Sequence, residues 1–360
     1  VGHLSARVNA AGADFRLLGT RDTMIPASVP VVAVTAVRTG CGKSQTSRFT
    51  AQTLRQAGYK VVVVRHPMPY GDLTKQAVQR FAEFDDLAKH NCTFEEREEY
   101  ESHIAEGSVV YAGIDYGAIL DQASKECDVL IWDGGNNDFP FFKPDLWLTV
   151  ADPLRPGHES RYYPGEVNFR AADVILINKS KRAPADDVAA VAAAAAEMNP
   201  KATVIRTASA VSVADPAAVT GKRVLCIEDG PTLTHGEMTF GAAQVAAESY
   251  NAAEVVDPRP HAVRSIRETL DKYPHIGKLL PAMGYFPEQI ADLEESIRAT
   301  ECDAVLIGTP FDISRQLKLD KPAVRVSYAL AAVDGEPAVD GIILSAVEAA
   351  SQAKKTNKSS

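Results

Sequence analysis

The clearest chemical signal is the stretch Gly40-Cys41-Gly42-Lys43-Ser44, which follows the apolar run 31–34. In the pattern G-x-x-x-x-G-K-[ST], backbone amides at a helix start surround a phosphate, the lysine meets the outer phosphates, and the hydroxyl binds Mg²⁺. Val37 stands at the first glycine of that pattern, which lowers its specificity. We predict a phosphate-binding loop, with an ordinary strand-to-helix turn as the alternative.

A second apolar run, 128–133, ends in Asp133 and two glycines. In proteins with a phosphate-binding loop, an aspartate at such a strand end holds the magnesium ion opposite the loop hydroxyl. We therefore predict Ser44 and Asp133 as the metal ligands. Asn136 and Asn137 follow on the same rim and are candidate substrate contacts.

The strand predicted at 60–65 ends at Arg65 and is followed by His66 and Asp72. Pro67 and Pro69 exclude helix and strand there, so the segment must be a loop. Loops after parallel strands are where α/β proteins place ligand groups, and all three polar residues are candidates. For His66, a capping or core role is equally consistent with the spacing.

A further rim loop, 151–166, carries Arg155, His158 and Arg161 at a spacing of three. Guanidinium groups bind phosphates through two parallel hydrogen bonds, so this cluster favours a polyanionic substrate. A solvated surface loop is the alternative.

After the apolar run 174–177, Asn178-Lys179-Ser180-Lys181 resembles the guanine-reading N-K-x-D motif. Lys181 replaces the aspartate that would accept hydrogen bonds from guanine. Asn178 and Lys179 are therefore nucleotide-site candidates, and we expect ATP rather than GTP.

Alternating β-branched runs and helical segments predict an α/β fold with a mainly parallel sheet flanked by helices, similar to P-loop NTPases. We expect the remnant of an upstream lobe at 1–29, a nucleotide-binding domain at 30–212, a further α/β part at 213–345 and a polar tail at 346–360, disordered from 354. The stretch 83–106 predicts two helices with a solvated acidic face. The turn 228–237 is either a second substrate contact or a plain turn.

The composition is that of a globular protein, with 46% apolar and 24% charged residues in 360. A net charge of −9 argues against general nucleic-acid binding. Five scattered cysteines indicate neither a disulfide framework nor a zinc site. The cysteine pattern favours a reducing, cytoplasmic compartment. No apolar run approaches the roughly 18 residues of a membrane span, so we expect no insertion into a membrane.

Several segments together resemble the cyclic 2,3-diphosphoglycerate synthetase family, over almost the whole chain. They are AVRTGCGKSQTSR, VVVVRHPMPYGDL, HNCTFEEREEYE, LIWDGGNNDFPF, DPLRPGHE with YYPGE, and EDGPTLTHGEM. The resemblance implies an ATP- and Mg²⁺-dependent ligase that closes a phosphoanhydride in 2,3-diphosphoglycerate. Assembly as a homodimer is a further possibility.

The same resemblance places residues 40–45, including Cys41 and Gln45, around ATP. It gives Lys43, Asp133, Arg38 and His66 catalytic roles, and it puts substrate phosphates against Arg38, Arg65, His66, Arg155, His158 and Arg161. Two alternatives remain. One is a related P-loop kinase, ligase or GTPase with another small anionic substrate, and the other is a nucleotide-dependent switch or metal-delivery protein.

Overall fold

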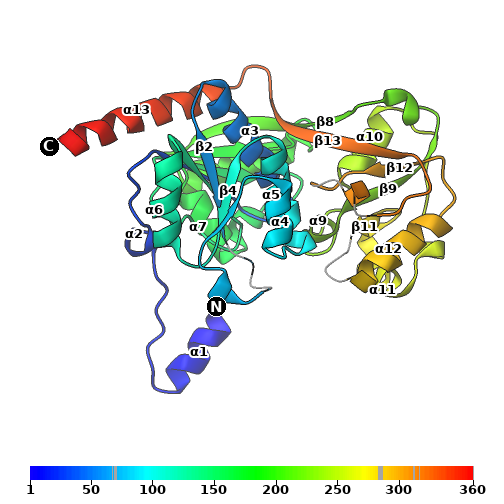
Figure 1. Ribbon diagram of the computed structural model, residues 1–360, viewed down its shortest axis with the longest axis horizontal. Coiled ribbons are helices and arrows are strands. Elements are labelled where there is room, and N and C mark those ends of the chain that lie inside the picture. The colour runs from blue at the N-terminus through cyan, green and yellow to red at the C-terminus, as the bar shows by residue number, and fades with distance from the viewer. Residues whose placement is uncertain (67, 69–70, 283–286, 311–312, 316, 360) are drawn as a thin grey trace.

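The computed structural model of the chain describes residues 1–66, 68, 71–282, 287–310, 313–315 and 317–359. Within them, one sheet of thirteen strands runs through the whole molecule in the order β10-β9-β12-β13-β8-β7-β6-β1-β5-β2-β4-β3, with β11 also paired to β9. Figure 1 shows two parts side by side, joined by the long strands β8 and β13. The predicted fold class, a mainly parallel α/β sheet flanked by helices, is confirmed.

The first part contains a parallel sheet with one antiparallel edge strand, β3. Its strands are β1 (Val31–Ala36), β2 (Val61–Arg65), β3 (Gln79–Phe81), β4 (Val109–Ala112), β5 (Val129–Asp133), β6 (Leu146–Ala151), β7 (Val174–Ile177) and β8 (Thr203–Val213). Its helices are α3 (Lys43–Gln56), α4 (Phe84–Lys89), α5 (Phe94–Ala105), α6 (Tyr116–Glu126), α7 (Tyr163–Ala171) and α8 (Ala185–Met198).

The central strands β1, β2, β5, β6 and β7 are buried at every position, because helices cover both faces of the sheet. In β2, Val61 and Val63 belong to one buried cluster together with residues of α3, α4 and α5. Val62 and Val64 point to the opposite face and pack in a cluster with residues of α6. Alternate side chains of one strand therefore serve two cores, as the period of a strand requires.

The second part is a smaller α/β unit built on parallel strands. Its strands are β9 (Arg223–Asp229), β10 (Glu254–Val255), β11 (Leu280–Ala282), β12 (Ala304–Ile307) and β13 (Ala323–Ala332). Its helices are α9 (Gly230–Leu233), α10 (Ala242–Ser249), α11 (Arg264–Lys272) and α12 (Pro287–Ala299). We keep the boundary near residue 212 as a proposal.

The antiparallel pair β8 and β13 joins the two parts, in register from Val326 opposite Val213 to Ala332 opposite Thr207. The sequence predicts only short strands here, near 203–206 and 323–327. Both strands are longer because each extends beyond its own part and finds its partner in the other.

The structure differs from the prediction at the carboxyl end of the chain. Residues 354–359, predicted to be disordered, continue the helix α13 (Val339–Ser359). The Lys354 ammonium lies 2.8 Å from Asp145 and donates to the carbonyls of Ala27 and Val29. These contacts attach Lys354, the first residue of the stretch predicted to be disordered, to the segments that contain Ala27, Val29 and Asp145. At the other end are α1 (Gly2–Ala10), which has no buried residue, and α2 (Thr20–Thr23).

Candidate nucleotide and substrate site

The predicted phosphate-binding loop leads from β1 into α3, with Gly42 as the residue before the first helical turn. Its φ angle of 109° favours glycine. A Cβ atom added there would lie 2.2 Å from Asn178 Nδ2 and 2.5 Å from Gln45 Nε2, so no larger residue fits. Helix α3 therefore begins at Lys43 with its first backbone amides at the edge of the cavity described below.

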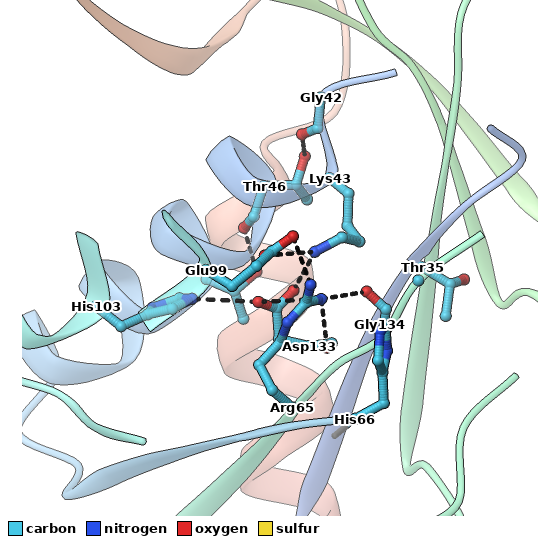
Figure 2. A network of polar contacts seen from close by, with 12 residues as sticks. Thr35, Gly42, Lys43, Thr46, Arg65, His66, Glu99, His103, Asp133 and Gly134 are labelled. Carbon is cyan, nitrogen blue, oxygen red and sulfur yellow. Dashed lines mark hydrogen bonds and ion pairs between the residues drawn. The ribbon is translucent and has the colours of Figure 1, made fainter. Parts of the chain in front are cut away.

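Lys43, Asp133, Arg65, Glu99 and His103 form one polar network next to this loop (Figure 2). Lys43 Nζ lies 2.8 Å from Asp133 Oδ1, and His103 Nε2 lies 3.3 Å from Asp133 Oδ2. Arg65 pairs with Glu99 at 2.6 Å and donates to the carbonyls of Asp133 and Gly134. The predicted strand-end aspartate and loop lysine thus meet directly.

The Asp133 carboxyl group is 1% exposed, and its ionisation state follows from its neighbours. Burial by itself favours the neutral acid, but Lys43 and Arg65 outweigh burial and hold the pKa of Asp133 well below its usual range. The group is an anionic oxygen donor at neutral pH, which is the kind of ligand that Mg²⁺ takes.

Sequence reasoning missed Glu99 and His103, because it assigned the acidic stretch 83–106 to a solvated face. The two predicted helices are present as α4 and α5. On α5, however, positions 99 and 103 are one helical turn apart and face the loop, where they contact Lys43, Arg65 and Asp133. Their i, i+4 spacing was the available signal.

The side chains of Asn178 and Lys179 hold the predicted phosphate-binding loop through its backbone carbonyls. Asn178 is fully buried, and its Nδ2 donates to the carbonyl of Cys41 at 3.0 Å. Lys179 Nζ donates to the carbonyl of Gly40 at 2.6 Å and lies 2.9 Å from Asp152 Oδ2. The remnant of the N-K-x-D motif thus shapes the loop, a role that does not depend on the missing aspartate.

Arg155 is 9% exposed, and its guanidinium is occupied by protein groups. It donates to the carbonyls of Thr39 and Gly236 and lies 2.9 Å from Asp152. Gly236 belongs to the second part of the chain, so Arg155 connects that part to the phosphate-binding loop. The side chain is in position to hold the loop rather than to present a free cation.

Arg38 makes a second connection of this kind. It donates to the carbonyl of His235, lies 3.2 Å from Glu237, and stacks over the ring of Tyr162. His158 Nδ1 is 3.2 Å from Arg38, and burial together with the neighbouring arginines lowers the pKa of His158. The neutral imidazole is therefore favoured at neutral pH.

Other predicted residues are spread around these contacts. His66 Nδ1 is 3.0 Å from Asp138, and Asn136 accepts a hydrogen bond from Thr39. Arg161 is exposed, and Asp72 caps the short turn that follows it by accepting from the backbone and hydroxyl of Thr74. Pro67, Pro69 and Tyr70 of the predicted loop lie outside the described residues.

A cavity of about 790 Å³ unites most of this site with the second part of the chain. From the first part, the predicted residues that line it are Arg38, Gly40, Gly42, Lys43, Ser44, Gln45, Arg65, His66, Asn136, Asn137 and Lys179. From the second part it includes Glu228, Asp229, Thr232 and His235. Residues of the turn 228–237 therefore line the cavity. The predicted site residues that do not line it are Asp72, Cys41, Asp133, Arg155, His158, Arg161 and Asn178.

This combination of a parallel sheet, a glycine-lysine-serine helix start and a strand-end aspartate defines a P-loop NTPase-like protein. A solved structure agrees: LpxK from Aquifex aeolicus, determined in complex with ATP, matches with a TM-score of 0.57 at 10% identity, over 97% of this chain and 96% of LpxK. No protein-family model matches the sequence.

Among curated proteins, "Arginine synthetase ArcE" from Thermococcus kodakarensis is 60% identical over 341 residues, which are 95% of this chain and 76% of the relative. The chain belongs to the family of this arginine synthetase. It is an enzyme of the ATP-dependent synthetase type on a P-loop fold.

The resemblance to cyclic 2,3-diphosphoglycerate synthetases is a distant one, so the assignment of that activity and of 2,3-diphosphoglycerate as substrate is wrong. The curated enzyme of that name from Pyrococcus furiosus is 20% identical over 221 residues, 55% of this chain and 50% of the relative. Sequence motifs of the nucleotide site do not specify the second substrate.

None of the described helices is both long and apolar enough to cross a membrane. Among the residues that the structure describes, no three or more histidine, cysteine or acidic side chains are grouped so that they could hold a metal ion.

Proposed function

We propose that this enzyme uses ATP and Mg²⁺ to make arginine. The observation that carries the proposal is the 60% identity, over 95% of the chain, to an arginine synthetase. The proposal corresponds to the first of the two alternatives drawn from the sequence, a related P-loop ligase with a different substrate. The nucleotide site of the chain provides what such an enzyme needs.

The nucleotide would lie at the start of α3, with its phosphates against the amides that follow Gly42. Ser44 lines the cavity, and the ionised Asp133 lies behind it with its oxygens in contact with Lys43 and His103. The Ser44 hydroxyl, and the Asp133 carboxylate once Lys43 moves, would be the magnesium ligands. These oxygen donors fit Mg²⁺. When bound, the ion would neutralise charge on the phosphates. Lys43 would leave Asp133 to meet the outer phosphate, with Glu99 and Arg65 keeping the network ordered.

The chemistry of arginine sets the second substrate. Its guanidinium carbon can be formed from the ureido carbon of citrulline in two steps. The terminal phosphoryl group of ATP is transferred to the ureido oxygen, breaking the bond to ADP. Ammonia, formed by loss of one proton from ammonium, then adds to the carbon, and phosphate leaves with the former ureido oxygen. The products are arginine, ADP, phosphate and one proton.

The protein would act mainly by holding the reactants together and stabilising charge. The cavity suits an amino acid that becomes cationic, because Glu98, Glu99, Glu228 and Asp229 line it in addition to the basic residues of the nucleotide side.

The proposal is tested by incubating the purified protein with ATP, MgCl₂, citrulline and isotopically labelled ammonium chloride. We expect labelled arginine by mass spectrometry, with ADP and phosphate released in equal amounts. Omitting citrulline should remove most ADP release. ADP release that is independent of citrulline and ammonium, without labelled arginine, would refute the proposal.

A further inference from the structure

One buried carboxyl group in the cavity has no part in the nucleotide site. Glu228 lies at the carboxyl end of β9, in the second part of the chain, and is 1% exposed although it lines the cavity. The carboxyl ends of parallel strands are the usual position for ligand groups in α/β proteins. Glu228 thus lies where the second part of the chain would contact a substrate.

The backbone around Glu228 is shaped to accommodate its side chain. A Cβ atom added to Gly241 would lie 2.2 Å from Glu228 Oε2, and one added to Gly308 would lie 2.5 Å from the same atom. Glu228 Oε1 accepts a hydrogen bond from the Gln244 amide, 2.8 Å away in the first turn of α10. Two glycines and a helix start therefore surround this carboxylate, and larger residues at either glycine would displace it.

The described residues contain no lysine, arginine or histidine in an ion pair with Glu228. Burial raises the pKa of Glu228 to about 8 and the charge of Asp229 adds to this effect, whereas backbone hydrogen bonds from Gln244, Ala243 and Ala242 at the start of α10 oppose it. The other buried carboxylates of the site differ, because Asp133 has Lys43 and Arg65, and Asp152 has Arg155 and Lys179. Glutamate is seldom fully buried without a cationic partner.

We propose that Glu228 is the counter-ion for an ammonium group of the substrates, an inference that rests on the proposed function. With a pKa of about 8, Glu228 is mostly the neutral acid at neutral pH when no ligand is bound. A cationic nitrogen entering the cavity would supply a positive charge, lower that pKa and favour the carboxylate. Two sources share this chemistry: the α-ammonium group of citrulline and arginine, and the ammonium ion that provides the new nitrogen. The alternative is that Glu228 serves only as a cap for α10.

The substitution Glu228→Gln separates these roles. Glutamine keeps an oxygen that can accept from the Gln244 amide and has nearly the same volume, but it has no negative charge. The matched control is Asp292→Asn, because Asp292 is a carboxylate of the same part, 6% exposed, that is already paired with Arg264 and does not line the cavity.

The measurements are the KM values for citrulline and ammonium chloride, and the Kd values for arginine and ADP by calorimetry. Loss of one charge-assisted contact should weaken the affected ligand about tenfold or more. A higher KM for citrulline and a higher Kd for arginine, with unchanged KM for ammonium, supports the α-ammonium group as the partner. A higher KM for ammonium alone supports the nitrogen donor. In both cases the Kd for ADP should be unchanged, and Asp292→Asn should alter none of the four.

Unchanged values for citrulline, ammonium and arginine in Glu228→Gln would overturn the inference. Equal weakening of ADP and arginine, together with a lower melting temperature, would also overturn it, because the carboxylate would then serve the fold. If the wild-type protein neither forms nor binds arginine, the proposed function fails and the assignment of Glu228 fails with it.

Discussion

Loss of the negative charge of the Asp152 carboxylate should affect both the site and the stability of the fold. Asp152 is 3% exposed and accepts from Arg155 and Lys179, each at 2.9 Å. The same two cations donate to the carbonyls of Thr39 and Gly40 in the phosphate-binding loop. In Asp152→Asn both cations stay buried beside a neutral amide, so we expect the loop and the fold to be destabilised together.

The size of the effect follows from the burial of these groups. Removing one partner of a buried ion pair costs about 3–5 kcal/mol. An unfolding entropy of about 2.1 cal/mol/K per residue gives about 0.8 kcal/mol/K for 360 residues. The melting temperature should therefore fall by about 4–7 °C. Because Lys179 shapes the loop at Gly40, the affinity for ATP should fall as well.

Differential scanning calorimetry and ATP titration would measure both effects. The matched control is Glu166→Gln, which removes an exposed i, i+4 pair with Arg170 and should cost at most about 0.5 kcal/mol. A melting temperature of Asp152→Asn within about 1 °C of that of the control would refute the argument that this carboxylate compensates two buried cations.

The difference in stability between wild type and Asp152→Asn should depend on pH, and the pKa shift of Asp152 determines the direction. Although burial opposes it, Lys179 and Arg155 lower the pKa of Asp152 in the folded protein. A lowered pKa means that the stability contribution is complete above the unfolded value of about 3.9 and is lost as the pH falls through the folded value. The gap between wild type and Asp152→Asn should therefore be constant from pH 7 to about pH 4.5 and narrow only below that range.

The other predictions concern the nucleotide and the predicted basic loop. Lys43→Ala and Asp133→Asn should each lower the rate of ADP release about a hundredfold or more, and a near-normal rate in both would contradict their assignment. Because Lys181 stands where a guanine-reading aspartate would be, ATP should bind more tightly than GTP in competition calorimetry, and tenfold tighter GTP binding would contradict this. Arg161→Ala should leave the melting temperature and ATP affinity unchanged because Arg161 is exposed, whereas Arg155→Ala should lower both. If both variants kept the wild-type melting temperature and ATP affinity, the contacts of Arg155 would not be needed.

Local sequence was sufficient for the elements whose chemistry is contained in a short segment. A glycine at position 42, a lysine and a serine after an apolar strand specify the helix start, because the backbone conformation at Gly42 and the following amides depend on neighbours within a few residues. The all-apolar runs of β2, β5 and β7 likewise predicted buried strands and hence the parallel sheet. The polarity of residues 354–359 predicted disorder, whereas these residues continue α13 and Lys354 contacts segments some 200 or more positions earlier.

The substrate side of the site was decided by contacts between distant segments. Arg155 looked like an anion-binding residue, but its guanidinium is satisfied by Asp152, Thr39 and Gly236, the last of them 81 positions away. The sequence assigned Glu99 to a solvated face, and it assigned Glu228 to a turn that was either a substrate contact or a plain turn. The packing of α5 and β9 places both side chains along the cavity. The residue type determines which charge a side chain can carry. Whether the protein neutralises that charge or leaves it for a ligand depends on burial and pairing, and these depend on segments that are distant in the sequence.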